Sequence, residues 1–165
     1  MTVPPAAEDI AAEIIDLLTA RRQTVAVAES LTGGLVAAAL TSVPGSSLAF
    51  RGGVVAYATP LKVALLGVPE RLLAEHGPVH ADVAMAMARG VATRLGTTFG
   101  LATTGVAGPG PADGHPAGTV FVAVGKGLEA DALGLQLTGT RAEVRAASVS
   151  SVLSLLVRKL GEDIS

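Results

Sequence analysis

The chain has 165 residues with 12 basic and 14 acidic side chains, a formal net charge of −2, and no cysteine. The missing cysteine excludes thiol nucleophiles, thiolate metal sites and disulfide frameworks. The low and balanced charge argues against a nucleic-acid partner, because a protein that binds nucleic acid needs a basic face to neutralise phosphates. A chain of this length buries enough surface to hold one core, so we expect a single domain over 1–165.

The sequence carries no pattern typical of secretion or of a membrane span. Residues 1–10 lack the basic start and apolar run of a signal peptide and contain two acidic side chains, Glu8 and Asp9. Residues 30–50 are uncharged, but glycine, serine and proline interrupt them, whereas a membrane helix needs about 20 predominantly apolar residues. We therefore expect a cytoplasmic protein without a membrane partner.

Helical and strand patterns alternate along the chain. In chain order, the predicted elements are a helix over 6–21, a strand over 24–28, a helix over 31–40, a strand over 47–58, a short helix over 60–66, a helix over 80–95, strands over 97–104, 118–125 and about 130–138, and a helix over 141–160. This order predicts an α/β fold whose sheet is covered on both faces. A hairpin near Lys126 and Gly127 indicates an antiparallel pair, so the sheet should be mixed. Two glycines in the strand over 47–58 indicate a bulge or a close approach.

Ser30 is the first candidate site residue, because it follows a predicted strand and precedes a glycine-rich helix start. Ligand crevices in open α/β sheets form outside the carboxyl ends of strands. Thr32, Gly33 and Gly34 come next; glycines let a ligand approach the backbone, and a helix N-terminus favours a phosphate or an oxyanion. Two interpretations stay open from the residues alone: Ser30 is a nucleophile, or it is the N-cap of the helix, where serine is common.

A serine nucleophile needs a base, and Lys62 is the best candidate in the sequence. It lies among apolar residues of the predicted helix over 60–66, where desolvation lowers the pKa of a lysine toward that of a useful base. The alternative is a side chain whose ammonium reaches water along the helix surface. Histidine is a poorer choice, because the three histidines lie in loops or at a helix start without an accompanying carboxylate signature: His76, His80 and His115.

Three further segments supply candidate substrate contacts. Tyr57, the only tyrosine, ends a predicted strand and offers a ring that could stack on a planar substrate, although packing at the strand edge is the usual role of such a residue. Thr104 and Gly105 end another strand in a glycine-rich loop that matches neither a dinucleotide-binding fingerprint nor a phosphate-binding P-loop. Arg141 and Arg145 share one face of the last helix, where they could grip a phosphate or carboxylate, although a solvated face is the default. No metal-ligand cluster is evident, so we expect no metal and no other cofactor.

Taken together, six segments resemble the CinA C-terminal domain family. They are 28–34 (AESLTGG), 43–47 (VPGSS), 51–57 (RGGVVAY), Lys62 with 65–68 (LLGV), 104–110 (TGVAGPG) and 118–120 (GTV). Their order and spacing agree with the family from the first helix to the last.

The resemblance implies a three-layer α/β/α sandwich with a mixed, mostly parallel sheet. It also implies a metal-independent amidohydrolase that converts nicotinamide mononucleotide to nicotinic acid mononucleotide and ammonia. Ser30 then matches the family's nucleophile and Lys62 its base, with Tyr57 and Thr104 as further catalytic positions. The substrate contacts implied are Thr32, Gly33, Gly34, Gly105 and Arg141.

One segment departs from the family pattern. Residues 58–61 read Ala-Thr-Pro-Leu where the family often has Ser-Asn-Glu-Ala, so polar groups next to Lys62 are replaced. This change keeps a second hypothesis open, a non-catalytic nucleotide-binding or partner domain of the competence and damage-inducible type. A serine peptidase is a weaker alternative, because glycine-rich loops suit a small phosphorylated ligand. The expected partner is a small nucleotide, and the small residues on several helices favour a homo-oligomer, with a dimer preferred.

Overall fold

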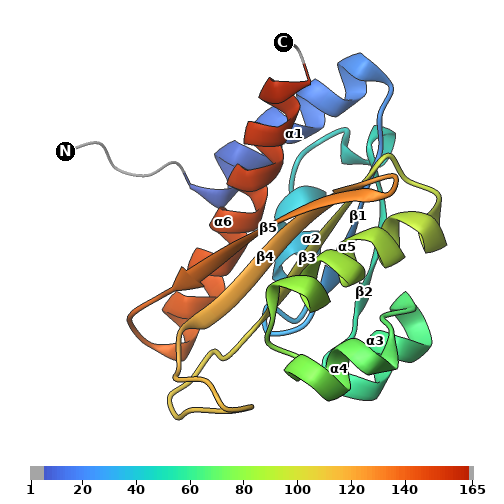
Figure 1. Ribbon diagram of the computed structural model, residues 1–165. Helices are drawn as coiled ribbons and strands as arrows, with labels where there is room; N and C mark the ends of the chain where they lie inside the picture. The colour runs from blue at the N-terminus through green and yellow to red at the C-terminus, as the bar shows by residue number, and fades with distance from the viewer. Residues whose placement is uncertain (1–5, 164–165) are drawn as a thin grey trace.

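The computed structural model describes residues 6–163, which form a five-stranded sheet with helices on both faces (Figure 1). The strands are β1 (Val25–Glu29), β2 (Phe50–Val55), β3 (Phe99–Gly105), β4 (Thr119–Lys126) and β5 (Glu129–Gln136). The helices are α1 (Ala7–Arg21), α2 (Leu35–Thr41), the short 3-10 helix η1 (Ser46–Leu48), α3 (Thr59–Leu66), α4 (Glu70–His76), α5 (Ala81–Leu95) and α6 (Arg141–Glu162). The three-layer α/β/α prediction is confirmed. The expectation about a secretion signal falls partly on residues 1–5, which lie outside the described residues.

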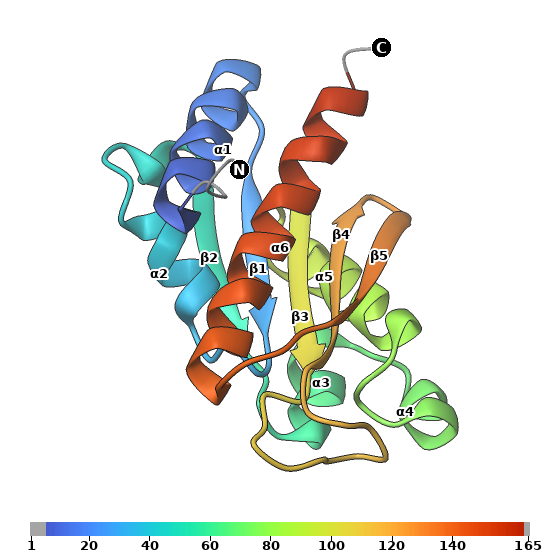
Figure 2. The same ribbon diagram turned by 90° about the vertical axis from the view of Figure 1, so that its left-hand side faces the viewer.

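The sheet is mixed, with the strand order β2-β1-β3-β4-β5. Strand β1 pairs in parallel with β2 and β3, whereas β4 pairs antiparallel with β3 and β5. Four of the five described strands therefore point the same way, as the mostly parallel prediction requires. Figure 2 shows the carboxyl ends of β1, β2 and β3 at one end of the molecule, beside α3 and the loop between β3 and β4. This end of the sheet is where a ligand crevice is expected.

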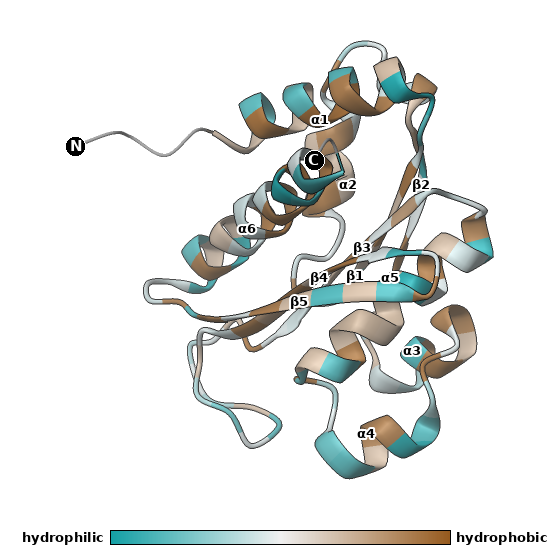
Figure 3. Cartoon of the chain, turned by 45° about the horizontal axis from the view of Figure 1, so that its top comes forward, coloured by the Kyte–Doolittle hydropathy of each residue, from teal (hydrophilic) through white to brown (hydrophobic). Residues whose placement is uncertain are grey.

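The two faces of the sheet differ in the size of their side chains. The face toward α1, α2 and α6 carries large apolar residues such as Val27 and Leu101. The opposite face carries small residues such as Ala28 and Ala102, and it packs against α5. Figure 3 shows hydrophobic residues along the central strands, between the two helical layers. The chain thus has one apolar core on each face of the sheet.

Small residues let α5 approach the strand backbone very closely. A Cβ atom on Gly100 of β3 would collide with the carbonyl oxygen of Ala88 in α5. A Cβ atom on Gly90 of α5 would collide with the carbonyl oxygen of Leu66 in α3. Interiors this tightly packed leave no room for a methyl group, so both positions require glycine. The packing holds α5 on the sheet and α3 on α5.

The predicted elements all have counterparts, but their ends differ by a few residues. The helix predicted over 31–40 begins only at Leu35, and α4 was not predicted, because glycine and proline punctuate the segment around it. The predicted bulge is confirmed, since Val25 pairs with Phe50 while Ala26 pairs with Gly52. None of the helices that the structure describes has the length and apolar character needed to cross a membrane.

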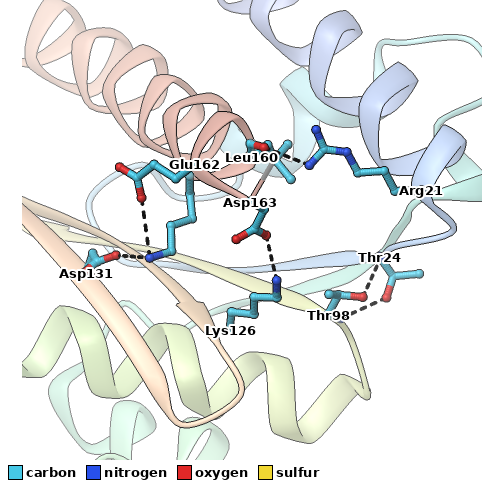
Figure 4. Close-up of polar contacts among 9 residues, drawn as sticks. Arg21, Thr24, Thr98, Lys126, Asp131, Leu160, Glu162 and Asp163 are labelled. Atoms are coloured by element: carbon cyan, nitrogen blue, oxygen red, sulfur yellow. Dashed lines mark hydrogen bonds and ion pairs between the residues drawn. The ribbon is translucent and has the colours of Figure 1, made fainter. Parts of the chain in front are cut away.

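The end of α6 is tied to the β4–β5 hairpin by two ion pairs (Figure 4). Lys126 Nζ donates to Asp163 Oδ2 at 2.7 Å, and Lys159 Nζ donates to Asp131 Oδ2 at 2.6 Å. Surface pairs of this kind contribute about 0–1 kcal/mol each. They therefore orient α6 on the sheet, while the apolar core supplies most of the stabilisation.

Candidate active site

Ser30 lies directly after β1, at the carboxyl end of the sheet. Its backbone N–H donates to the carbonyl oxygen of Thr103 in β3 at 3.1 Å, which extends the parallel ladder by one residue. Helix α2 begins later, at Leu35, and its N-cap is Gly34. The interpretation of Ser30 as the helix N-cap is therefore wrong, and its hydroxyl is free to make other contacts.

Lys62 reaches Ser30 from the first turn of α3. Its Nζ atom lies 3.0 Å from Ser30 Oγ, and the two residues are 32 positions apart in the chain. Lys62 is only 1% exposed, so the alternative of an ammonium that reaches water along the helix surface is wrong. The buried side chain therefore ends at Ser30, the residue that follows β1.

Burial lowers the pKa of Lys62 from 10.5 to about 8, because desolvation penalises the charged amine. The carboxylate of Asp113 acts in the opposite direction by charge attraction, and its effect is smaller. At pH 7 this shift raises the neutral fraction of the amine about 300-fold, to roughly one-tenth. The site therefore holds a lysine that can accept a proton near neutral pH.

Two backbone carbonyls orient the amine of Lys62. Nζ donates to the carbonyl oxygen of Ala56 at 2.8 Å and lies 3.5 Å from the carbonyl oxygen of Tyr57. A neutral amine has two N–H bonds and one lone pair. When the N–H bonds point to these two carbonyls, the lone pair faces Ser30 Oγ, which is the arrangement of a base with its nucleophile.

Ser30 and Lys62 line a cavity of about 240 Å³ at the end of the sheet. This volume is slightly below the roughly 300–1,000 Å³ of most small-molecule pockets, so the cavity suits a compact ligand. The other lining residues relevant to its chemistry are Tyr57, Thr59, Thr104, Gly105, Asp113 and Arg141.

Arg141 and Tyr57 stand together at the rim of the cavity. Arg141 Nη1 donates to the carbonyl oxygen of Gly108 at 2.8 Å, and Nη2 donates to Tyr57 Oη at 3.4 Å. Tyr57 is 62% exposed, so its ring is open to a ligand. The two contacts hold the guanidinium at the cavity mouth, where it can meet an anion.

Thr104 and Gly105 form part of the cavity wall at the end of β3. The hydroxyl of Thr104 is engaged, because it donates to the carbonyl oxygen of Pro78 at 2.6 Å and ties the loop before α5 to the sheet. A Cβ atom on Gly105 would lie 2.6 Å from the carbonyl oxygen of Thr119. The packing of β3 against β4 therefore requires glycine here.

Thr32, Gly33 and Gly34 do not line the cavity, although they were expected to contact substrate. Thr32 is fully buried, and its hydroxyl bonds to a threonine hydroxyl of β3 at 2.8 Å. Gly33 and Gly34 have φ angles of +57° and +113°, so the turn into α2 requires glycine for its backbone conformation. Arg145 Nε donates to the carbonyl oxygen of Leu31 at 2.9 Å and holds this turn from outside. These residues shape the turn that presents Ser30.

Glu29 supports the site from outside the cavity wall and was not predicted to do so. It is 1% exposed, and its carboxylate accepts hydrogen bonds from the N–H groups of Val36 at 2.8 Å and Ala37 at 3.1 Å. It thus caps α2 from the end of β1 and occupies amides that the helix would otherwise leave free. The signal in the sequence is an acidic residue at the end of an apolar strand. A carboxylate buried there needs hydrogen-bond donors, which the first N–H groups of the next helix can supply.

Asp113 and Thr59 also line the cavity without having been predicted. Asp113 has a φ angle of +51° and lies in the turn between Ala112 and His115, which form a short antiparallel bridge. The Asp-Gly pair at 113–114 is a typical turn signal, but nothing local indicates that the turn folds back over the cavity.

Solved structures of other proteins share this architecture. The competence/damage inducible protein CihA from Agrobacterium tumefaciens superposes with a TM-score of 0.89 at 35% identity, covering 98% of this chain and 99% of its own. A CinA superfamily protein from Klebsiella pneumoniae superposes with a TM-score of 0.92 at 31% identity, covering 96% of this chain and 99% of its own.

Curated relatives and a family model point the same way. A CinA-like protein from Frankia casuarinae is 50% identical over 147 residues, which are 89% of this chain and 34% of the relative. One from Gemmatimonas aurantiaca is 43% identical over 161 residues, which are 94% of this chain and 38% of the relative. The chain thus spans about a third of the length of these relatives. The model of the CinA C-terminal domain matches residues 7–160. The chain therefore belongs to the CinA C-terminal domain family.

Proposed function

We propose that this chain is a metal-independent amidohydrolase that converts nicotinamide mononucleotide to nicotinic acid mononucleotide and ammonia. Ser30 is the nucleophile and Lys62 is the base. The observation that carries the proposal is the buried 3.0 Å contact between Lys62 Nζ and Ser30 Oγ in the wall of a cavity. Burying an amine costs free energy, and groups with such a lowered pKa gather at functional sites. Membership of the family, whose pattern implies this reaction, supports the same assignment.

In the first half of the reaction, neutral Lys62 takes the proton of Ser30 while Oγ attacks the carboxamide carbon. A C–O bond forms, and the carbonyl oxygen takes the negative charge of the tetrahedral intermediate. Collapse of the intermediate breaks the C–N bond. Protonated Lys62 returns its proton to the departing nitrogen, which leaves as ammonia, and an acyl-enzyme remains on Ser30.

In the second half, Lys62 takes a proton from a water molecule that attacks the ester carbon. The bond to Ser30 breaks, and Lys62 returns the proton to Oγ. The product is the carboxylic acid, which ionises in water. One group thus acts as base and then as acid in each half, a task that suits a pKa of about 8.

The backbone amide of Gly105 is the best-placed donor to the oxyanion. Successive N–H groups of a strand point to opposite sides within the sheet. The N–H of Val106 donates to Thr119 of β4 at 2.8 Å, so the N–H of Gly105 points to the other side, where β1 has ended. The N–H of Gly33 is a poorer candidate, because it donates to the carbonyl oxygen of Ser30 at 3.1 Å. One such donor contributes about 3–4 kcal/mol to the stability of the transition state.

The lining of the cavity fits a nucleotide with a flat, positively charged ring. The exposed ring of Tyr57 can stack on the pyridine ring, and the carboxylate of Asp113 favours its positive charge. Arg141 at the mouth can bind the phosphate through two N–H bonds. With the ring on Tyr57 and the phosphate on Arg141, we infer that the carboxamide extends toward Ser30.

The proposal is tested by measuring ammonia and nicotinic acid mononucleotide released from nicotinamide mononucleotide, with a chelator present. Wild type is compared with Ser30→Ala and Lys62→Met, which remove one member of the pair each. Ser42→Ala and Lys126→Ala are the matched controls, because both residues lie outside the cavity. We expect turnover by wild type and both controls, and a loss of at least about 1,000-fold in the two site variants.

Two other outcomes would overturn the proposal. Turnover that survives in Ser30→Ala would show that another group attacks the amide. Wild type that binds the nucleotide without turnover would favour the non-catalytic nucleotide-binding domain, and residues 58–61, which include the cavity residue Thr59, would then be the first segment to examine.

A further inference from the structure

A second group of side chains with ligand atoms converges away from Ser30 and Lys62. His76 ends α4, His80 is the N-cap of α5, and Asp82 lies in the first turn of α5. Each side chain offers one possible metal-binding atom, and these three atoms lie within 4.8 Å of one another. Among residues 6–163, no other group of three or more such side chains converges in this way. The expectation that the chain lacks a metal-ligand cluster is corrected by this finding. It failed because α4, which positions His76, was not predicted.

The distances are close to those of a zinc site. Asp82 Oδ2 lies 3.8 Å from His76 Nε2 and 3.8 Å from His80 Nδ1. Zinc bonds of about 2.0–2.2 Å to nitrogen and oxygen place neighbouring ligand atoms of a tetrahedral site roughly 3.3 Å apart. Each of these two nitrogen–oxygen pairs must therefore close by about half an ångström. The side chains are 32%, 34% and 48% exposed for His76, His80 and Asp82, so they have room to move.

The backbone between the two histidines is held in place. Gly77 has a φ angle of +73°, and the ring of Pro78 fixes the next φ. The carbonyl oxygen of Pro78 accepts the hydroxyl hydrogen bond of Thr104 at 2.6 Å. Because the loop is already ordered, a metal would not have to order it on binding, which favours affinity. Pro78 and Val79 also line the cavity, so the cluster stands next to its wall.

Binding requires local rearrangement of the two imidazole rings. The rings stack with their centroids 3.8 Å apart and an interplanar angle of 5°. The lone pair of an imidazole nitrogen lies in the plane of its ring, so two stacked rings cannot both point a lone pair at one ion. Coordination must therefore tilt the rings. His80 Nδ1 accepts the N–H of Asp82 at 3.1 Å, so this nitrogen already has the unprotonated form that a metal needs. Coordination replaces that hydrogen bond. Glu75 Oε2 lies 3.7 Å from His76 Nε2 but outside the converging set, so water would supply the fourth ligand.

We propose that His76, His80 and Asp82 form a binding site for Zn²⁺ that holds the loop behind the cavity wall. Two imidazoles and one carboxylate suit Zn²⁺, whereas Mg²⁺ and Ca²⁺ prefer oxygen ligands throughout. The site is separate from the chemistry of Ser30 and Lys62, which supply nucleophile and base themselves.

The test titrates chelator-treated, dialysed protein with Co²⁺ and Zn²⁺. One equivalent of Co²⁺ should give the visible absorption of a tetrahedral complex, which Zn²⁺ then abolishes by displacement. Zn²⁺ at 100 times its Kd should raise the melting temperature by roughly 5–10 °C. His76→Ala and Asp82→Asn should each weaken binding at least about tenfold, since losing even an outer partner of a metal ligand costs 10- to 100-fold. His115→Ala, which changes the third histidine, is the matched control and should bind as wild type does.

Melting curves without metal show whether each variant folds. If one of the two site variants does not fold, the other one alone carries the test. The proposal is overturned if wild type gives neither the Co²⁺ spectrum nor the Zn²⁺-dependent rise, or if both site variants bind as tightly as wild type. Ser30→Ala should bind Zn²⁺ normally, so failure of the amidase proposal and failure of this one are distinguishable.

Discussion

The buried amine of Lys62 makes a specific prediction for stability as a function of pH. Its pKa is about 8 in the folded protein and 10.5 in the unfolded chain, so the unfolded state binds more protons between these values. The contribution of Lys62 to stability is therefore lowest below pH 8 and rises with pH until about 10.5. At 1.36 kcal/mol per pKa unit, the full change is about 3 kcal/mol.

The measurement is urea unfolding followed by circular dichroism from pH 7 to pH 10, for wild type and Lys62→Met. Methionine fills a similar volume without a titrating group, and the loss of the hydrogen bond to Ala56 does not change with pH. All other groups titrate in both proteins, so the difference isolates Lys62. The free energy of unfolding of wild type should gain about 2.5 kcal/mol over the variant between pH 7 and pH 10. A difference that stays constant within about 0.5 kcal/mol would refute the lowered pKa, and with it the neutral base.

Because only neutral Lys62 accepts a proton, kcat/KM for nicotinamide mononucleotide should rise with pH and level off above about pH 8. A kcat/KM that stays constant from pH 6 to 9 would contradict the role of Lys62 as base. Arg141→Met should raise KM for the mononucleotide about 10- to 100-fold by removing a charged hydrogen bond to phosphate. If Arg141→Met raised KM by the same factor for nicotinamide riboside, which has no phosphate, Arg141 would not be the residue that binds the phosphate. Gly100→Ala should lower the free energy of unfolding by about 1–3 kcal/mol, because the new methyl collides with Ala88. Gly161 of α6 faces open space, so Gly161→Ala should change the free energy of unfolding by less than about 1 kcal/mol. If urea unfolding gave the same free energy for Gly100→Ala and Gly161→Ala, the tight packing of α5 on β3 would be refuted.

The elements of the fold were predictable where their signals are local. The last helix was expected over 141–160 and forms over Arg141–Glu162, because its apolar period continues over many turns and Thr140 with Glu143 builds a capping box. The start of α2 was misplaced, since the glycines after Ser30 were assigned to the helix although they form the turn before it. Short α4 escaped detection because seven residues between glycine and proline carry too little periodicity.

The site was less predictable, because its contacts join distant parts of the chain. No local pattern reports that Lys62 reaches Ser30 across 32 residues. The residue types made Lys62 the best candidate base, with a solvent-reaching side chain as the alternative, and the family resemblance favoured the pair. Their catalytic roles stay predictions. Gly33 was assigned to substrate because a glycine that a turn requires and a glycine that a ligand requires look the same in one sequence. The role of Glu29 depends on where α2 begins, which the sequence did not show.

The two halves of the chain contribute different parts of the cavity. Ser30 and Lys62 come from the first two parallel strands and the helix that follows them, whereas Gly105, Asp113 and Arg141 come from the second half of the chain. Changes in the later segments can therefore alter the cavity lining while Ser30 and Lys62 keep their 3.0 Å contact and Lys62 stays buried. The loop between β3 and β4 also reaches the amine electrostatically, because the carboxylate of Asp113 raises the pKa of Lys62 and its loss would lower that pKa further.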